Sequence, residues 1–131
     1  MRPFFLRSNN SREINSPHTL GREGEKIALN LLKKKKYRIV QQGFRMFRGE
    51  IDIIAYDGKD LVFIEVKSRR SSKFGCPEES VTTAKQKQIK KIARGYLHDH
   101  DIHNTPCRFD VIAVTFFEKD IEVTHFKDAF H

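Results

Sequence analysis

Gly49-Glu50-Ile51-Asp52 is the most informative segment of this chain, together with Glu65-Val66-Lys67, which begins thirteen residues after Asp52. They place three carboxylates and one lysine in two short apolar segments, where charged side chains are normally excluded. Burying one unpaired carboxylate costs on the order of several kcal/mol. We therefore expect a bound group to hold these charges, and a divalent cation with a phosphate substrate is the leading candidate.

The two stretches are predicted to form a β-hairpin. Residues 50–57 and 61–67 have the character of strands, and Asp57-Gly58 between them is a strong turn signal. A turn of even length, with either Gly58-Lys59 or Asp57-Gly58 as its loop, gathers the charged side chains on one face. Those side chains are Glu50, Asp52, Glu65 and Lys67. A three-residue turn would instead separate Asp52 from Glu65.

The gathered charges predict a particular chemistry. Opposed Cβ atoms lie about 4.5–5.5 Å apart in a hairpin, so the negative charges of Asp52 and Glu65 should repel each other. This repulsion should either raise the pKa of one of the two carboxyls or recruit a cation. Carboxylate oxygens suit Mg²⁺ or Mn²⁺, and Lys67 could orient an attacking water or stabilise charge on phosphate. The pattern predicts a metal-dependent phosphodiesterase centre with Asp52, Glu65 and Lys67 as catalytic residues. The alternative is a solvated hairpin face with a Glu–Lys cross-strand pair.

The rest of the chain predicts a single α/β domain over residues 20–131. An apolar stripe with helical spacing starts at Leu20, and a second helix is expected over residues 83–98. The expected strands cover residues 37–44, 50–57, 61–67, 108–117 and 121–126. The order α-β-β-β-α-β-β predicts a mixed central sheet flanked by helices. Residues 1–19 are polar and are predicted to form a loose N-terminal arm.

Three further side chains border the expected hairpin face. Glu25 precedes Ala28 and Leu32 along the first apolar stripe, so it could reach the sheet as a further metal ligand. The alternative is an ordinary glutamate in a first helical turn. Lys85 and Gln88 extend the core stripe of the second helix toward one end of the sheet, where they either face the site or serve helix solubility.

The composition favours a polyanionic partner. Lys and Arg total 25 against 17 Asp and Glu, which gives a net charge of +8 and a pI near 9.7. Such an excess suits nucleic acid or an anionic surface. The side chains expected to contact phosphate backbones are Arg69, Arg70, Lys73, Lys85, Lys87, Gln88 and Lys91. The alternative is solvated surface charge.

Other classes of protein fit the sequence poorly. The two cysteines, Cys76 and Cys107, form no CxxC pair, which argues against a disulfide scaffold or a cysteine zinc site. No apolar run approaches the roughly 20 residues that span a bilayer, so we expect no membrane partner and a cytoplasmic location. The histidines at 98, 100 and 103 fit no familiar zinc spacing and are interpreted as a polar helix end.

Five motifs follow one another within residues 20–126. They are Gly21-x-x-Gly24-Glu25-x-x-Ala28, Gly49-Glu50-Ile51-Asp52-Ile53-Ile54, Phe63-Ile64-Glu65-Val66-Lys67-x-Arg69, Lys85-x-x-Gln88 and Arg108-Phe109-Asp110-Val111. In this combination the chain resembles the bacterial YraN family. That family looks like a branch of the restriction-endonuclease-like PD-(D/E)XK fold and is similar to archaeal Holliday-junction resolvases.

The resemblance implies a role for each matching position. Asp52 would be the acid of the first motif, and Glu65 and Lys67 the acid and lysine of the second. Glu25 would be the acid carried by a helix, with Lys85 and Gln88 as accessory helix positions. Ile51 stands where the name of the fold has proline, but that proline is not a ligand. Glu50 and Asp110 match the family pattern without an assigned role, and Asp110 is expected to pair with Arg108 or another basic residue.

Together these observations predict a nucleic-acid-binding protein that acts as a Mg²⁺-dependent endonuclease on branched or structured DNA. Glu25, Asp52 and Glu65 would hold one or two ions, and water would attack phosphorus in line with assistance from Lys67. One alternative is a non-catalytic nucleic-acid-binding module of the same fold. Another is an adaptor whose charged face docks an acidic protein. Junction-cutting relatives act as dimers, so the resemblance also implies a homodimer.

Overall fold

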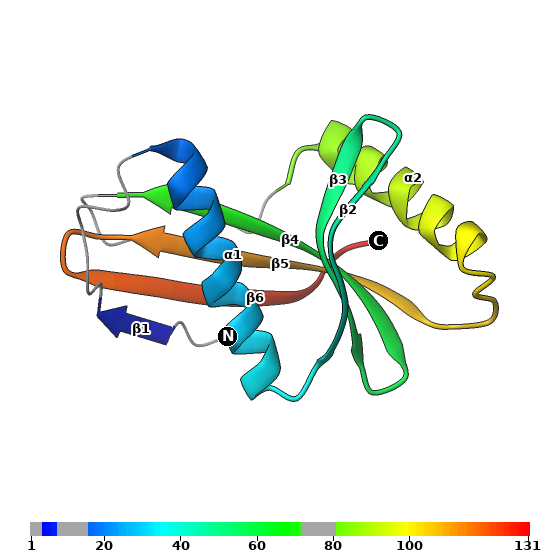
Figure 1. The fold of residues 1–131 in the computed structure, drawn as a ribbon, viewed down its shortest axis with the longest axis horizontal. Helices are drawn as coiled ribbons and strands as arrows, with labels where there is room; N and C mark the ends of the chain where they lie inside the picture. Colours follow the sequence, from blue (N-terminus) through cyan, green and yellow to red (C-terminus); the bar gives the residue numbers. More distant parts are fainter. Residues whose placement is uncertain (1–3, 8–15, 72–80) are drawn as a thin grey trace.

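Two helices pack on a twisted six-stranded sheet in a computed structural model that describes residues 4–7, 16–71 and 81–131 (Figure 1). The elements in chain order are β1 (Phe4–Arg7), α1 (Pro17–Lys34), β2 (Arg38–Met46), β3 (Gly49–Asp57), β4 (Asp60–Arg70), α2 (Thr83–Asp99), β5 (Cys107–Phe116) and β6 (Asp120–Phe130). The strand order is β1-β6-β5-β4-β3-β2, with β4 and β5 parallel and the other recorded pairs antiparallel. The predicted mixed α/β sheet and the order of elements from α1 onward are confirmed.

The sequence placed residues 1–19 in a loose N-terminal arm, but residues 4–7 form strand β1. Phe4 pairs with Val123 and Arg7 with Asp120, so this segment closes the edge of β6, where backbone groups would otherwise lack partners. Helix α1 already begins at Pro17, after an N-cap at Ser16. The prediction for residues 1–3 and 8–15 falls outside the described residues.

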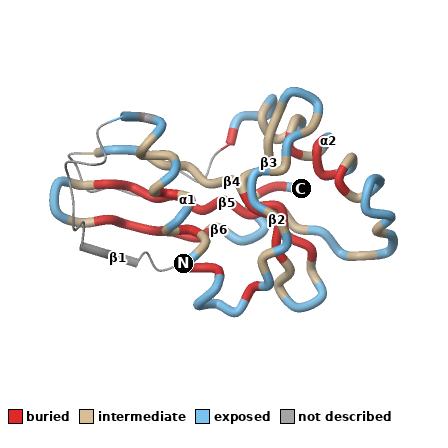
Figure 2. Tube along the Cα trace, in the orientation of Figure 1, coloured by how far each residue is buried: buried red, intermediate tan, exposed pale blue. Residues whose placement is uncertain are grey.

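Each helix covers a different face of the sheet. Because strand residues alternate between faces, Ile53 and Ile64 pack in the cluster under α1, whereas Ile54 and Phe63 pack in the cluster under α2. Buried positions follow the central strands (Figure 2). Neither described helix is long and apolar enough to cross a membrane.

The β3–β4 hairpin has a turn of even length, as predicted. Asp57 pairs with Asp60 across Gly58-Lys59, and the ladder continues to the pair Ile53–Ile64. This register is the first of the two that the sequence left open.

Strand β3 changes orientation at Asp52. The pairs Phe44–Ile51 and Gln42–Ile53 place Gly43 opposite Asp52, and Gly43 has a positive φ of 65°. Ile51 packs in the cluster under α2, although Ile53, two residues later, packs under α1. The strand therefore twists sharply at Asp52. The prediction that Glu50 shares one face with Glu65 is wrong, because Glu50 lies beside Glu25 of α1 whereas Glu65 reaches Lys85 of α2.

Candidate metal centre

Asp52 lies where strands β3 and β4 part. The ladder between them runs to the pair Ile53–Ile64, and at the next step Asp52 Oδ2 accepts a hydrogen bond from Val66 N at 2.8 Å. A side-chain carboxylate has thus taken the place of a main-chain acceptor. This bond fixes the Asp52 carboxylate between the two strands.

Three carboxylates converge at this point. Glu25 of α1 and Glu50 and Asp52 of β3 each bring an oxygen within 4.8 Å of the others, and all three residues are half-buried. Burial, followed by the charges of Asp52 and Glu50, raises the pKa of Glu25. Glu50 also pairs with Arg45, whose Nε lies 3.0 Å from Glu50 Oε2. The cluster offers several hard oxygen donors to one small volume.

Gly24 lets helix α1 bring Glu25 to the sheet. A Cβ on Gly24 would collide with Ser68 Oγ of β4, so the helix lies against that strand only because the residue has no side chain. The glycine therefore sets the height of Glu25 above the sheet.

Glu65 adjoins Asp52 but reaches toward α2. Its side chain is 13% exposed, and Lys85 Nζ lies 3.5 Å from Glu65 Oε2. Burial and then contact with the Asp52 carboxyl raise the pKa of Glu65 to about 8, against the opposing charge of Lys85. The fold therefore favours the protonated form of Glu65.

Of the predicted ligands, Asp52 lies beside both Glu25 and Glu65, but the group with oxygens within 4.8 Å of one another contains Glu50 in place of Glu65. The sequence assigned Glu50 no role. No alternation pattern within β3 could have found it, because the face change at Asp52 breaks the rule that residues two apart share a face.

The accessory positions also lie near these carboxylates. Lys67 is half-buried on β4, one same-face step beyond Glu65, and its backbone pairs with Ala113 of β5. Gln88 packs against Gly49, because a Cβ built on that glycine would lie 2.6 Å from Gln88 Nε2. Lys85 thus faces Glu65 of β4, and Gln88 faces Gly49 of β3.

The other residues expected to contact nucleic acid occupy two surfaces. Arg69 and Arg70 are exposed at the end of β4, where Arg69 Nε lies 3.3 Å from Thr115 Oγ1. Lys87 and Lys91 are exposed on α2 and line a groove of about 530 Å³. Lys73 lies outside the described residues.

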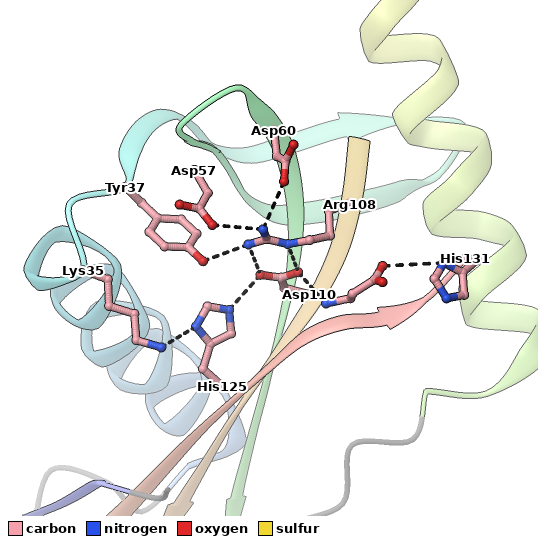
Figure 3. Close-up of polar contacts among 9 residues, drawn as sticks. Lys35, Tyr37, Asp57, Asp60, Arg108, Asp110, His125 and His131 are labelled. Carbon is pink, nitrogen blue, oxygen red and sulfur yellow. Dashed lines mark hydrogen bonds and ion pairs between the residues drawn. The ribbon is translucent and has the colours of Figure 1, made fainter. Parts of the chain in front are cut away.

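A second polar cluster surrounds Asp110, at the start of β5 (Figure 3). Asp110 is fully buried and accepts hydrogen bonds from Arg108 Nε at 2.9 Å, from His125 Nε2 at 2.8 Å and from the Asp128 amide at 2.9 Å. The expected pairing of Asp110 with Arg108 is confirmed.

The same network reaches the ends of α1 and β3. Arg108 also donates to Asp57 Oδ2 at 2.9 Å and to the Tyr37 hydroxyl at 2.8 Å. Lys35 Nζ lies 2.9 Å from His125 Nδ1, and because an ammonium only donates, Nδ1 accepts and Nε2 carries the proton toward Asp110. We interpret this network as a clamp that ties α1, the β3–β4 turn, β5 and β6 together.

Comparison with known proteins identifies close relatives. The uncharacterised protein family UPF0102 matches residues 24–114. A UPF0102 protein of Chlorobaculum tepidum is 51% identical over 123 residues, which cover 89% of this chain and 95% of its own. A UPF0102 protein of Chlorobium limicola is 49% identical over 120 residues, which cover 87% of this chain and 93% of the chain of that relative. One of Geobacter sulfurreducens is 44% identical over 112 residues, 85% of this chain and 88% of its own.

Proposed function

For a chain that belongs to the uncharacterised protein family UPF0102 (YraN), we propose a metal-dependent endonuclease that hydrolyses phosphodiester bonds in branched or structured DNA. The observation that carries the proposal is the convergence of Glu25, Glu50 and Asp52, with Glu65 beside them, where β3 and β4 part. The resemblance to PD-(D/E)XK nucleases, drawn from the order of the motifs, points to Glu25, Asp52 and Glu65.

The donor set fits a small divalent cation. Half-buried carboxylate oxygens within 4.8 Å of one another are the hard ligands that Mg²⁺ and Mn²⁺ prefer. Glu25, Asp52 and Glu65 would hold one or two such ions, with Glu50 as a further ligand. When bound, the ion supplies Lewis-acid stabilisation of the phosphoryl oxygens and lowers the pKa of water.

The remaining residues of the site position substrate and water. Lys67 follows Glu65 on the same face of β4, where an ammonium can orient the attacking water and stabilise charge that develops on phosphate. The hydrogen bond from Val66 N holds Asp52 in one rotamer while substrate binds. Arg69, Arg70, Lys87 and Lys91 contribute affinity for phosphate backbones. A homodimer and a cytoplasmic location belong to the same proposal.

The test is a cleavage assay over flap, fork, four-way junction, single-stranded and duplex DNA with Mg²⁺ or Mn²⁺, run beside Asp52→Ala. We expect cleavage of at least one branched substrate, its loss in EDTA, and a reduction of at least about 100-fold in Asp52→Ala. Asp99→Ala, at an acid with a 53% exposed side chain at the end of α2, is the matched control and should cut normally. Cleavage that survives Asp52→Ala would refute the site.

Two ion pairs favour a second candidate, a nucleic-acid-binding module that does not cut. Arg45 Nε lies 3.0 Å from Glu50 Oε2, and Lys85 Nζ lies 3.5 Å from Glu65 Oε2, so protein cations already contact two of the four acids. Calorimetric titration with Mn²⁺ separates the two candidates. Heat of binding that disappears in Asp52→Ala supports the nuclease, whereas intact DNA binding without metal binding supports the module.

A further inference from the structure

The tip of the β2–β3 hairpin presents an aromatic ring to solvent. Phe47 is 52% exposed and forms a two-residue turn with Arg48. Both residues have positive φ, 53° and 58°, a conformation that hairpin turns usually assign to glycine or asparagine. The chain therefore keeps a phenylalanine at a position where both backbone strain and exposure disfavour it.

The hairpin tip is fixed against helix α2. A Cβ on Gly95 would collide with Met46 Sδ and lie 3.0 Å from Phe47 Cε2, and a Cβ on Gly49 would lie 2.7 Å from Ile92 Cδ1. The two glycines thus allow the hairpin to lie directly on the helix (Figure 1). Because the ring is already held in place, little conformational entropy is lost when a ligand covers it.

Phe47 forms one wall of the 530 Å³ groove, and helix α2 forms the other. The α2 residues that line it are Ala84, Lys85, Lys87, Gln88 and Lys91. Every titratable residue of this lining is a lysine. Lys91 Nζ lies 4.7 Å from the centroid of the Phe47 ring, so a cation accompanies the aromatic surface.

The groove leads to the carboxylates. Lys85 lines it and also pairs with Glu65 Oε2 at 3.5 Å. A strand lying in the groove would therefore present its next phosphates to the proposed metal centre.

We infer that this groove binds an unpaired stretch of nucleic acid, with one base stacked on Phe47 and the flanking phosphates on Lys87 and Lys91. A flat apolar ring among cations complements a base between phosphates. A fully paired duplex keeps its bases inside the helix, and an acidic protein would engage the lysines but not the ring. The inference rests on the proposed function, because it names the part of the substrate that the same site takes.

The absence of tryptophan from the sequence provides a direct test. Phe47→Trp introduces a single indole, and stacking on a base quenches its fluorescence. We expect a 15-nucleotide single strand to quench the indole in EDTA, where nothing is cut. The matched control is Val40→Trp, which replaces another exposed apolar side chain. Val40 is 40% exposed on β2 and does not line the groove, so its indole should keep its fluorescence.

Affinity measurements on the full chain give a second readout. Phe47→Ala should weaken binding of the single strand and of a fork by about ten-fold and binding of a blunt duplex by less than about two-fold. Phe47→Tyr, which keeps an aromatic ring, should bind the single strand and the fork as tightly as the wild type does. Melting temperatures close to that of the wild type show that each variant is folded. An unquenched indole at saturating DNA, or equal losses for single strand and duplex, would overturn the inference. Polyglutamate that binds as tightly as the single strand would overturn it in favour of an acidic protein partner.

The two proposals fail in different ways. Quenching without cleavage refutes the nuclease and supports the stacking groove. Cleavage that depends on Asp52 but not on Phe47, with no quenching, refutes the stacking groove alone.

Discussion

Glu65 links the candidate site to the stability of the whole protein. Its pKa is near 4.5 in an unfolded chain and is raised to about 8 in the fold by burial and by contact with Asp52. Between these values the folded protein keeps a proton that the unfolded chain releases. Stability from this group is therefore complete below about pH 4.5 and declines as pH rises toward 8.

Glu65→Gln should remove this decline, because an amide mimics the protonated acid. We expect the variant to melt about 5 °C above the wild type at pH 8 in EDTA and close to it at pH 5. Circular dichroism melts across this pH range measure the difference. Glu118→Gln, at an exposed position, is the control and should follow the wild type. Parallel curves for Glu65→Gln and the wild type would contradict the raised pKa.

Asp110 is a buried acid whose role is structural. Burial opposes its ionisation, but hydrogen bonds from His125, Arg108 and the Asp128 amide outweigh that effect and keep its pKa below the usual value. Asp110→Ala leaves Arg108 and His125 without this acceptor and should lower the free energy of unfolding by about 3–5 kcal/mol. Urea denaturation measures the loss.

The control for this prediction is Asp128→Asn. The Asp128 side chain is 53% exposed, and asparagine tolerates its positive φ of 53°. We expect a change below about 0.5 kcal/mol. If Asp110→Ala costs no more than this control, the network does not clamp the fold.

At the scale of elements, the packing of α1 on β4 sets the geometry of the acidic cluster. Gly21 and Gly24 lie in the same helix, but an added Cβ at Gly21 meets nothing within 4 Å, whereas one at Gly24 meets Ser68. Gly24→Ala should therefore cost about 1–3 kcal/mol and weaken Mn²⁺ binding, because it displaces Glu25. Gly21→Ala should gain about 0.5–1 kcal/mol and leave Mn²⁺ binding unchanged. Thermal melts and calorimetry measure both, and equal effects of the two substitutions would argue against this role of Gly24.

Hydrophobic periodicity and the Asp57-Gly58 turn signal were sufficient to predict the elements from α1 to β6, because these signals are local. The strand at Phe4–Arg7 was missed, since its pairing with β6 depends on an edge that forms from distant residues. The face change of β3 at Asp52 was also missed. It lies opposite Gly43, whose left-handed conformation on the neighbouring strand no pattern within β3 reveals.

The sequence could predict only those parts of the candidate site that depend on which face of a strand or helix a residue occupies. The hairpin register and the core stripe of α2 placed Asp52, Glu65 and Lys85 near one another. The closeness of Glu50 to Glu25 depends on how α1 sits on the sheet. The exposure of Phe47 depends on a turn whose residues, Phe47-Arg48, carry none of the usual turn signals.

At the scale of the whole molecule, the net charge of +8 predicts salt-sensitive binding of nucleic acid. Raising salt from 50 to 200 mM should weaken single-strand binding by at least about ten-fold. Lys87→Ala should reduce the slope of log K against log salt by about 0.7, because one phosphate contact is lost. Fluorescence anisotropy measures the slope. Lys33→Ala, exposed near the end of α1, is the control, and an equal reduction there would contradict a localised binding surface.

The parallel pairing of β4 with β5 has a consequence for the order of folding. Residues 61–70 join residues 107–116 across the intervening α2, whereas the hairpins β2–β3, β3–β4 and β5–β6 connect neighbours in the chain. Local hairpins close quickly, and the long-range ladder is expected to limit the folding rate. Glu25, Asp52 and Glu65 all precede β5 in the chain. A nascent chain that has not yet formed β5 therefore contains every proposed acidic ligand before it has the complete sheet that holds them in place.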